Sequence, residues 1–333
     1  MKINPVVASL SQPLFKQFFR DITGYQDILT QIHQVDPELP YAYLAEQINA
    51  YGAEVLLTGW GSVSLPESFL KDCPTIRYVC HLTGEMRWLL PRKLIEEGLL
   101  VTNWGSVISD NVAEGTLFLI LACLRRATSV VMTMQVRKGW DLDIDPPGSL
   151  LDKRIGIHGF GNIAQQLTYL LKPFRCSISA YSPPVPDYIF ESFSIQRETN
   201  LERLFEKNDV IIELEALTPT TERLIGKDLL ERIRPGGVFV NAGRGKVVCQ
   251  EDLEEVAALG KVFFGLDVYS QEPLPPDSPL RRLENVFLNP HLGGPTDDRI
   301  SLCTKHALAN LRAYHLGEPL DCVIGISEYD RMT

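Results

Sequence analysis

Short runs of apolar residues alternate with longer stretches of helical period along the first part of the chain. The apolar runs predict short strands at residues 3–10, 53–58, 76–82 and 99–103. The stretches between them predict helices near residues 13–20, 40–51, 66–72 and 91–97. Strands that alternate with helices in this way indicate an α/β unit with a parallel sheet. We therefore expect this part of the chain to form a domain of its own.

A second alternation of strands and helices begins at residue 153. Its apolar runs predict strands near residues 155–157, 178–181, 209–214, 237–241, 263–268 and 286–289. Helices are predicted between them, near residues 163–171, 226–233 and 250–258. The pattern therefore predicts a second parallel sheet, built from six strands.

Two further helices are predicted outside this alternation. The first begins near Asn111, where Glu114 completes a partial capping box, and runs toward Met134 as a link between the domains. The second covers about residues 297–315, and the tail after it is too short for another domain. We expect this C-terminal segment to pack back on the first domain.

A glycine-rich turn lies between the strand near residue 157 and the helix that follows it. The segment reads Gly159-Phe160-Gly161-Asn162-Ile163-Ala164, which has the Gly-x-Gly-x-x-Ala pattern. Gly159 permits the tight bend, and Gly161 lets the backbone approach a pyrophosphate at the helix N-terminus. Such a pattern alone can be a simple tight turn, but between a strand and a helix it predicts a dinucleotide site that includes Asn162 and Ile163.

Composition narrows the class of protein and its partners. The 333 residues are 45% hydrophobic and 22% charged, which is ordinary for a soluble chain of two domains. The net charge of -10 argues against nucleic acid as a partner. The seven cysteines form no Cys-x-x-Cys pair and predict reduced thiols, and no metal site is predicted. The N-terminus lacks a signal pattern and the longest apolar run, near 116–124, is too short for a bilayer, so we expect a cytoplasmic protein without membrane contact.

Three later segments resemble the signature blocks of the D-isomer-specific 2-hydroxyacid dehydrogenases. They are residues 241–245 (NAGRG), 266–273 (LDVYSQEP) and 289–294 (NPHLGG). The resemblance extends from Val101 to about Thr296 and is weaker before residue 76. It implies an α/β fold of two Rossmann-like or flavodoxin-like domains with parallel sheets. An NAD(P)-binding domain of residues 107–296 would be inserted into a substrate domain of residues 1–106 and 297–333.

Three residues of these segments suit the reduction of a 2-oxo acid. Arg244 offers a planar fork that can hold a carboxylate and polarise a carbonyl, although it could also be a surface arginine after a turn. His291 can supply a proton near neutral pH, although a lone histidine is usually structural. Glu272 can orient the imidazole, or it is a solvated carboxylate before Pro273. The resemblance makes Glu272 the proton-relay partner of His291.

The resemblance also implies the cofactor contacts. Asp267 would meet the nicotinamide end, although by itself it could be a cap. Further contacts are implied at Leu217, Ala242 and Gly243. Ser182 stands where the family usually has an aspartate for the ribose hydroxyls, so the cofactor is expected to be NAD, with NADP possible and only modest discrimination.

The substrate loop departs from the usual family pattern. Thr83 and Gly84 occupy the turn whose backbone amides meet the substrate carboxylate in the family. The larger side chains of Leu82, Met86 and Arg87 are expected to select the substituent on C2 and to favour substrates other than plain glyoxylate.

The sequence thus predicts an NAD(P)-dependent D-2-hydroxyacid dehydrogenase that transfers hydride between a nicotinamide cofactor and C2 of a small 2-oxo acid. The resemblance implies a homodimer joined through the nucleotide domains, with the helix from Asn111 at or near the interface. One alternative is a formate- or phosphite-type dehydrogenase of the same fold. Another is a cofactor-sensing, corepressor-like binding protein, which loss of Arg244, Glu272 or His291 would have favoured.

Overall fold

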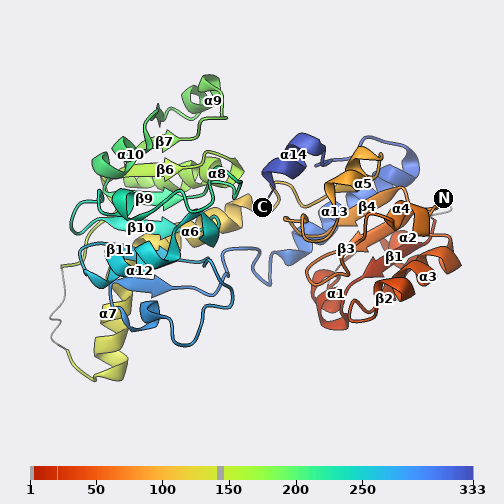
Figure 1. The fold of residues 1–333 in the computed structure, drawn as a ribbon, viewed down its shortest axis with the longest axis horizontal. Helices are drawn as coiled ribbons and strands as arrows, with labels where there is room; N and C mark the ends of the chain where they lie inside the picture. The colour runs from red at the N-terminus through yellow and green to blue at the C-terminus, as the bar shows by residue number, and fades with distance from the viewer. Residues whose placement is uncertain (1–3, 21, 141–145, 333) are drawn as a thin grey trace. The chain divides into compact units, whose positions relative to one another are not determined.

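The computed structural model describes residues 4–20, 22–140 and 146–332 (Figure 1). The chain divides into two compact units. Unit 1 consists of Met1–Ile108 and Thr296–Thr333, and unit 2 consists of Ser109–Pro295. Both ends of the chain therefore belong to unit 1, and unit 2 is inserted between them.

Within the described residues, unit 1 is built on a five-stranded parallel sheet with the order β2-β1-β3-β4-β5. Its strands are β1 (Val6–Ser9), β2 (Ile32–Val35), β3 (Val55–Thr58), β4 (Tyr78–His81) and β5 (Leu100–Thr102). Its helices are α1 (Gln12–Phe18), α2 (Gln26–Leu29), α3 (Tyr41–Tyr51), α4 (Phe69–Asp72), α5 (Arg92–Glu96), α13 (Ile300–Leu316) and α14 (Ile326–Arg331). Four of these strands lie in the predicted ranges, although residue 3 of the first range lies outside the described residues. The edge strand β2 was not predicted, because its apolar and polar residues give too short a run.

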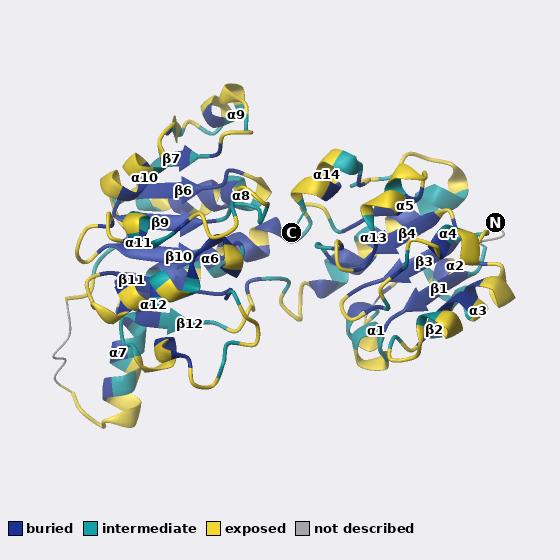
Figure 2. Cartoon of the chain, viewed as in Figure 1, coloured by how far each residue is buried: buried dark blue, intermediate teal, exposed yellow. Residues whose placement is uncertain are grey.

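Both faces of the unit 1 sheet are covered, and its three central strands, β1, β3 and β4, are buried (Figure 2). Val7, Leu56 and Val79 belong to one apolar cluster, together with Leu44 of α3. On the strand β4, Tyr78 lies with its ring centroid 5.2 Å from that of Tyr314 in α13. The C-terminal helix therefore packs on the sheet formed by the first part of the chain.

Unit 2 carries, in the part of the chain that is described, a seven-stranded parallel sheet with the order β12-β11-β10-β9-β6-β7-β8. The strands are β6 (Arg154–His158), β7 (Ser177–Tyr181), β8 (Gln196–Arg197), β9 (Val210–Glu213), β10 (Val238–Asn241), β11 (Phe263–Leu266) and β12 (Val286–Leu288). The α/β class and the parallel sheets are therefore confirmed. The six predicted strands are present, and the two-residue edge strand β8 is additional because so short a segment has no detectable period.

Helices cover both faces of the unit 2 sheet (Figure 1). They are α6 (Ser109–Leu124), α7 (Ala127–Val131), α8 (Asn162–Leu171), α9 (Asp187–Ser192), α10 (Leu201–Lys207), α11 (Lys227–Leu230) and α12 (Gln250–Ala258). Alternate residues of a strand point to opposite faces. Val210 and Ile212 of β9 accordingly pack in the cluster that includes α6 and α8, whereas Ile211 packs with residues of α10, α11 and α12. Burial on both faces explains the continuous apolar runs.

The strands of unit 2 end in register. The last residues of six strands pair in one row, which is Leu288, Leu266, Asn241, Glu213, His158 and Tyr181. The strand β6 lies between β7 and β9, so the strand order reverses there. Open α/β sheets bind ligands outside the carboxyl ends of their strands at such a switch point. The loops after this row are therefore the place to look for a site.

The long helix predicted from Asn111 toward Met134 is wrong as a single element. The helix α6 ends at Leu124, and α7 begins after Arg126, which has the left-handed φ of 58°. The chain bends by 64° at this break, and α7 continues into a π-helical turn, Met132–Val136. Among the described residues no single helix is long and apolar enough to cross a membrane. Only this bent pair reaches the necessary length and apolar composition, and only when its two halves are counted together.

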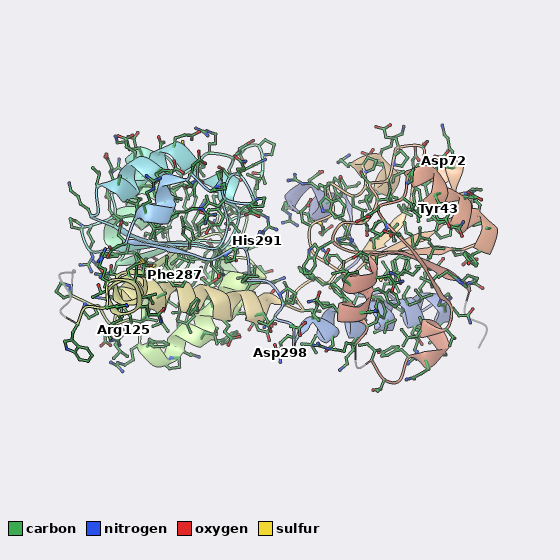
Figure 3. The ribbon with its side chains drawn as sticks, turned by 90° about the horizontal axis from the view of Figure 1, so that it is seen from below. Tyr43, Asp72, Arg125, Phe287, His291 and Asp298 are labelled. Carbon is green, nitrogen blue, oxygen red and sulfur yellow. The ribbon has the colours of Figure 1, made fainter. Side chains whose placement is uncertain are left out.

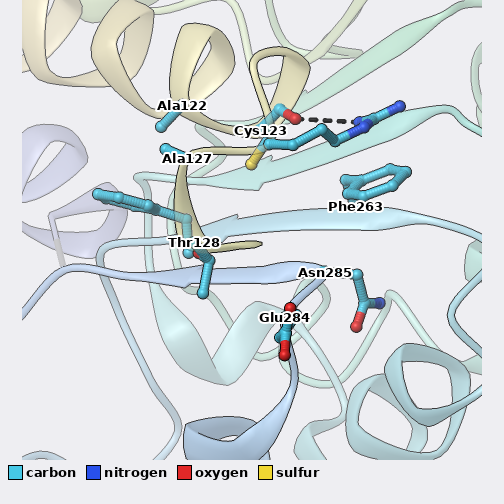
Figure 4. A pocket seen from close by; sticks show the side chains of 9 residues that line it. Ala122, Cys123, Ala127, Thr128, Phe263, Glu284 and Asn285 are labelled. Atoms are coloured by element: carbon cyan, nitrogen blue, oxygen red, sulfur yellow. Dashed lines mark hydrogen bonds between the residues drawn. The ribbon is translucent and has the colours of Figure 1, made fainter. Parts of the chain in front are cut away.

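Arg126 fixes the bend from inside the protein. Its Nη1 donates to the carbonyl oxygen of Cys123 at 3.0 Å, and its guanidinium lies 3.3 Å from the centroid of the Phe263 ring (Figure 4). A small pocket beside it is lined by residues of α6, α7 and the strands, including Thr128 and Asn285. No local pattern predicts this arrangement, because an arginine is an ordinary residue in a helix.

Candidate active site

His291 follows β12 (Figure 3). It contacts Glu272 of the preceding loop. Its Nδ1 lies 2.7 Å from Oε2 of Glu272, and Oε1 of Glu272 accepts the backbone N–H of Tyr269 at 3.0 Å. His291 has a left-handed φ of 54°, and its N–H donates to the carbonyl oxygen of Asp267 at 2.9 Å. The backbone thus sets the direction of the imidazole, and the carboxylate holds one of its two nitrogens.

The electrostatics of this pair favour a charged imidazole. The hydrogen bond with Glu272 raises the pKa of His291 above its ordinary value of 6.5, against the opposing effects of burial and of Arg244. Burial by itself would raise the pKa of Glu272, but the hydrogen bonds from His291 and Tyr269 lower it. The exposed fraction of the two side chains is 50% for His291 and 33% for Glu272. The raised pKa therefore favours a protonated imidazole, and the His291 side chain is half exposed to solvent.

Arg244 follows β10, the strand next to β11. Its Nη1 donates to the carbonyl oxygen of Gly243 at 2.8 Å, and its own carbonyl oxygen accepts Nδ2 of Asn241 at 3.2 Å. A Cβ atom on Gly245 would lie 1.9 Å from the carbonyl carbon of Tyr269, so only glycine fits there. This close approach brings the Arg244 loop against the segment that carries Glu272.

Asp267 is buried under the His291 turn. Its Oδ1 accepts Nδ2 of Asn289 at 2.6 Å and the N–H of Leu292 at 2.8 Å, and its Oδ2 accepts the N–H of Gly293 at 2.9 Å. These three hydrogen bonds satisfy the buried carboxylate. Besides the cofactor role that was predicted for it, Asp267 therefore holds the backbone on both sides of the turn that presents His291.

The glycine-rich turn has the geometry that a dinucleotide requires. Gly159 has a φ of 86°, and its N–H donates to the carbonyl oxygen of Tyr181 at 2.9 Å. Gly161 is exposed, precedes α8, and has open space around the position of a Cβ atom. Asn162 and Ile163 form the first turn of α8, where backbone N–H groups attract phosphate. These residues fit a pyrophosphate.

The other residues predicted to contact the cofactor also lie after the row of strand ends. Ser182 directly follows β7, and Ala242 and Gly243 directly follow β10. The N–H of Ala242 donates to the carbonyl oxygen of Glu213 at 3.3 Å. Leu217 lies in the loop after β9 and packs against the apolar cluster of α10, α11 and α12. The structure thus brings the predicted cofactor residues to one edge of the unit 2 sheet.

The predicted substrate turn lies in unit 1, directly after β4. Thr83 is fully buried, and its Oγ1 lies 2.6 Å from Nε2 of His81. Burial lowers the pKa of His81 to about 3, so this histidine stays neutral and is no source of protons. The carbonyl oxygen of Gly84 accepts Nδ2 of Asn103 at 2.8 Å. Hydrogen bonds to His81 and Asn103 therefore fix the turn.

Two tryptophans that the sequence analysis missed lie beside this turn. A Cβ atom on Gly84 would lie 2.6 Å from Nε1 of Trp104, and the ring of Trp104 lies 5.8 Å from that of Trp60, centroid to centroid. Both follow the ends of predicted strands, which was the signal that could have found them. Leu82 and Met86, which were expected to shape the pocket, are instead buried in unit 1, with Met86 in its apolar core.

A second pair of a histidine and a glutamate lies inside the unit 2 sheet. His158 ends β6, Glu213 ends β9, and Nδ1 of His158 contacts Oε2 of Glu213. His158 is 1% exposed and Glu213 is fully buried. His158 is therefore held by a side-chain contact inside the core. Its partner could have been noticed as an acidic residue that ends an apolar run.

Comparison with known proteins identifies the relatives of this chain. A family model for the NAD binding domain of D-isomer specific 2-hydroxyacid dehydrogenases matches residues 117–293. The chain is 34% identical over 233 residues to the glyoxylate reductase/hydroxypyruvate reductase of Homo sapiens, which covers 68% of this chain and 70% of that protein. It is 32% identical over 204 residues to the D-3-phosphoglycerate dehydrogenase of Methanocaldococcus jannaschii, which covers 61% of this chain but only 38% of that protein.

A solved structure has the same fold over nearly the whole chain. It is an NADPH-dependent glyoxylate/hydroxypyruvate reductase from Sinorhizobium meliloti, with a TM-score of 0.79 and 22% sequence identity. The match covers 99% of this chain and 100% of the other. At this level of identity the likeness establishes the fold.

The contact between His291 and Glu272 predicts a measurable pKa difference. The substitution Glu272→Gln should lower the pKa of His291, because a neutral amide no longer stabilises the imidazolium. NMR titration of the imidazole C–H resonances in both proteins would measure this difference. Asp277→Asn removes a charge from an exposed residue of the same loop and should leave the pKa of His291 unchanged. An equal pKa in wild type and Glu272→Gln would show that the contact does not control this histidine.

Proposed function

Because the chain belongs to the D-isomer-specific 2-hydroxyacid dehydrogenase family, we propose that it is an NAD(P)-dependent oxidoreductase of small 2-oxo and D-2-hydroxy acids. The observation that carries this proposal is the His291–Glu272 pair, which lies on loops adjacent to Arg244 at the sheet edge that also holds the glycine turn. A bound nicotinamide supplies the hydride for C2 in reduction and accepts it in oxidation. The intact pair favours an enzyme over a cofactor-sensing protein.

Arg244 anchors the substrate and acts as the electrophile. A guanidinium can form two parallel hydrogen bonds with a carboxylate, and it can also donate to the carbonyl oxygen of a 2-oxo acid. As C2 is reduced, negative charge develops on that oxygen, so the contact strengthens in the transition state. The contact between the Arg244 carbonyl oxygen and Asn241 supports this role, because it fixes the backbone of the arginine.

His291 donates the proton that converts the carbonyl oxygen into the hydroxyl group. Glu272 binds Nδ1 of the imidazole, which leaves Nε2 to donate toward the substrate. After the transfer, the neutral imidazole regains a proton from solvent, which its exposure permits. In the oxidative direction the neutral imidazole accepts the hydroxyl proton. The raised pKa of His291 therefore favours reduction at neutral pH and oxidation at higher pH.

The substrate turn suggests the kind of substituent on C2. Thr83 and Gly84 would meet the carboxylate through the backbone, as the resemblance implies. The indole of Trp104 lies next to that turn, and Trp60 packs against Trp104. Aromatic side chains bury apolar groups well and offer large contact areas. We therefore propose a 2-oxo acid with an apolar substituent larger than the hydrogen atom of glyoxylate.

The assembly that we propose is a homodimer joined through unit 2. The arm formed by α6, α7 and the following segment exposes several large apolar side chains, and α7 extends away from the sheet in Figure 1. The exposed apolar side chains of this arm are Phe118, Val131, Met134, Val136 and Trp140. Such a concentration of exposed apolar residues is typical of an interface between proteins.

All seven cysteines, each within the described residues, are free thiols, which supports a reducing, cytoplasmic location.

The activity is tested with a panel of 2-oxo acids, which should include glyoxylate, hydroxypyruvate, pyruvate and acids with longer or aromatic substituents. Wild type should reduce at least one of them with NADH or NADPH, and the larger acids should have the higher kcat/KM. His291→Asn should lower kcat for the best acid about 100- to 10,000-fold while the cofactor still binds. Near-normal turnover in His291→Asn would remove this residue from the mechanism. No turnover by wild type with any acid would argue for a binding protein.

Arg244 is tested by two substitutions that differ in the charge that they retain. Arg244→Ala should raise KM and lower kcat together, because the carboxylate contact exists in the ground state and the carbonyl contact strengthens in the transition state. Arg244→Lys keeps the charge but loses the fork, so it should restore little of the activity. Steady-state kinetics of both variants would measure this. Full activity in Arg244→Lys would mean that only a point charge is needed.

The homodimer is tested by placing a charge on the arm. Val136 is 62% exposed, and Val136→Glu would bury an unpaired carboxylate if the arm lies in the interface. We expect the dissociation constant of the dimer to rise about tenfold or more, since each 1.4 kcal/mol corresponds to a factor of about ten. Size-exclusion chromatography with light scattering would measure the shift toward monomer. Tyr188→Glu on α9, at another exposed apolar position, is the matched control and should leave the dimer unchanged.

A further inference from the structure

Glu215 lies directly beside the glycine-rich turn, although it comes from a different strand. A Cβ atom on Gly159 would lie 2.6 Å from Cα of Glu215, so the two backbones are in contact. Oγ of Ser182 donates to Oε2 of Glu215 at 3.3 Å, and the N–H of Ala216 donates to Oε1 at 3.0 Å. The carboxylate of Glu215 is therefore held next to the hydroxyl group of Ser182, beside the glycine turn.

The buried pair His158–Glu213 fixes the backbone of Glu215 in this place. Oε1 of Glu213 accepts the N–H of Glu215 at 2.7 Å, while Oε2 contacts His158. The N–H of Leu214 donates to the carbonyl oxygen of His158 at 2.8 Å. The residues just before the glycine turn and the residues just before Glu215 are thus tied to each other. The pair is buried, and its hydrogen bonds position the backbone of Glu215.

The carboxylate of Glu215 lies next to the position at which a dinucleotide fold usually has its ribose-binding acid. In a dinucleotide fold an acidic residue after the strand that follows the glycine turn usually accepts the hydroxyl groups of the adenosine ribose. Here Ser182 occupies that position in the sequence, after β7. Glu215 follows β9, on the other side of β6, and its carboxylate reaches the same serine. We infer that Glu215 supplies the missing acid, and that Glu215 and Ser182 together form the subsite for the 2′- and 3′-hydroxyl groups of NAD.

This subsite would select against NADP by charge. A carboxylate accepts hydrogen bonds from the two ribose hydroxyls, but it repels the 2′-phosphate that replaces one of them in NADP. Recognition of a 2′-phosphate would require a cation. Arg175 is paired with the carboxylate of Asp152, and Arg197 contacts the Ser182 loop. Arg197 is occupied by the carboxylate of Asp187 and by the carbonyl oxygen of Pro183 at 3.2 Å. Discrimination in favour of NAD should therefore be stronger than a serine at position 182 predicts.

The inference rests on the proposed use of a nicotinamide cofactor, and Glu215→Gln tests it. The substitution keeps the size and one acceptor oxygen, but it removes the charge. The ratio of the Kd of NADH to that of NADPH should rise about 10- to 100-fold, the usual range for loss of a charged hydrogen-bonding partner. Calorimetric titration of each cofactor, without any 2-oxo acid, measures this ratio. Ratios of kcat/KM with both cofactors should change in the same direction.

Glu222→Gln is the matched control, because Glu222 is an exposed acid in the same connection after β9. It makes the same change in net charge and should leave the ratio unchanged. Equal ratios in wild type and Glu215→Gln would overturn the inference, as would a wild type that binds NADPH as tightly as NADH. Since the titration uses no substrate, a panel in which no 2-oxo acid is reduced would count against the proposed function alone.

Discussion

The constraint on which the site depends is the register of the parallel strands in unit 2. Six strands end in one row, from Leu288 at β12 to Tyr181 at β7. In a parallel sheet the loops after successive strands emerge at the same edge, so residues far apart in sequence come close together. Arg244, His291 and Gly159 each lie within three residues of that row. The hydrophobic burial that aligns the strands thus also brings these three residues to one edge of the sheet.

Close backbone contacts convert this alignment into a site of fixed geometry. Gly245 packs on the backbone of Tyr269, and Gly159 packs on that of Glu215, at distances that a side chain would prevent. The carboxylate of Asp267 then holds the turn around His291 by accepting its backbone N–H groups. A buried carboxylate is costly unless its hydrogen bonds are satisfied, and an unsatisfied one would destabilise the protein by several kcal/mol. Packing at the glycines and hydrogen bonding at Asp267 therefore act together.

The sequence was sufficient to predict the helices and strands with a clear pattern of apolar residues, and to predict the candidate residues that follow strands. Continuous apolar runs identified the buried strands, and Arg244, Glu272 and His291 were found because they follow such runs in segments of familiar pattern. The sequence was insufficient where contacts between distant segments determine where a helix ends or which side chain is buried. The helix break at Arg126 depends on its contact with Phe263, some 140 residues away in sequence, and Met86 is buried because unit 1 packs around it. Glu215 lies beside Gly159 and Ser182 because β9 and β7 flank β6 in the sheet, and no local sequence pattern predicts such a contact.

The two pairs of histidine and glutamate in unit 2 show how environment separates structure from chemistry. In the buried pair, burial raises the pKa of Glu213 more than His158 lowers it, while the carboxylate outweighs burial and raises the pKa of His158. Both groups are buried, and Glu213 also accepts the backbone N–H of Glu215, so the pair fixes the backbone around it. His291 and Glu272 make a similar contact, but the imidazole is half exposed. The proposed reaction requires a proton that can exchange with solvent, and this difference in exposure suits the His291–Glu272 pair to that reaction and the buried pair to holding Glu215 in place.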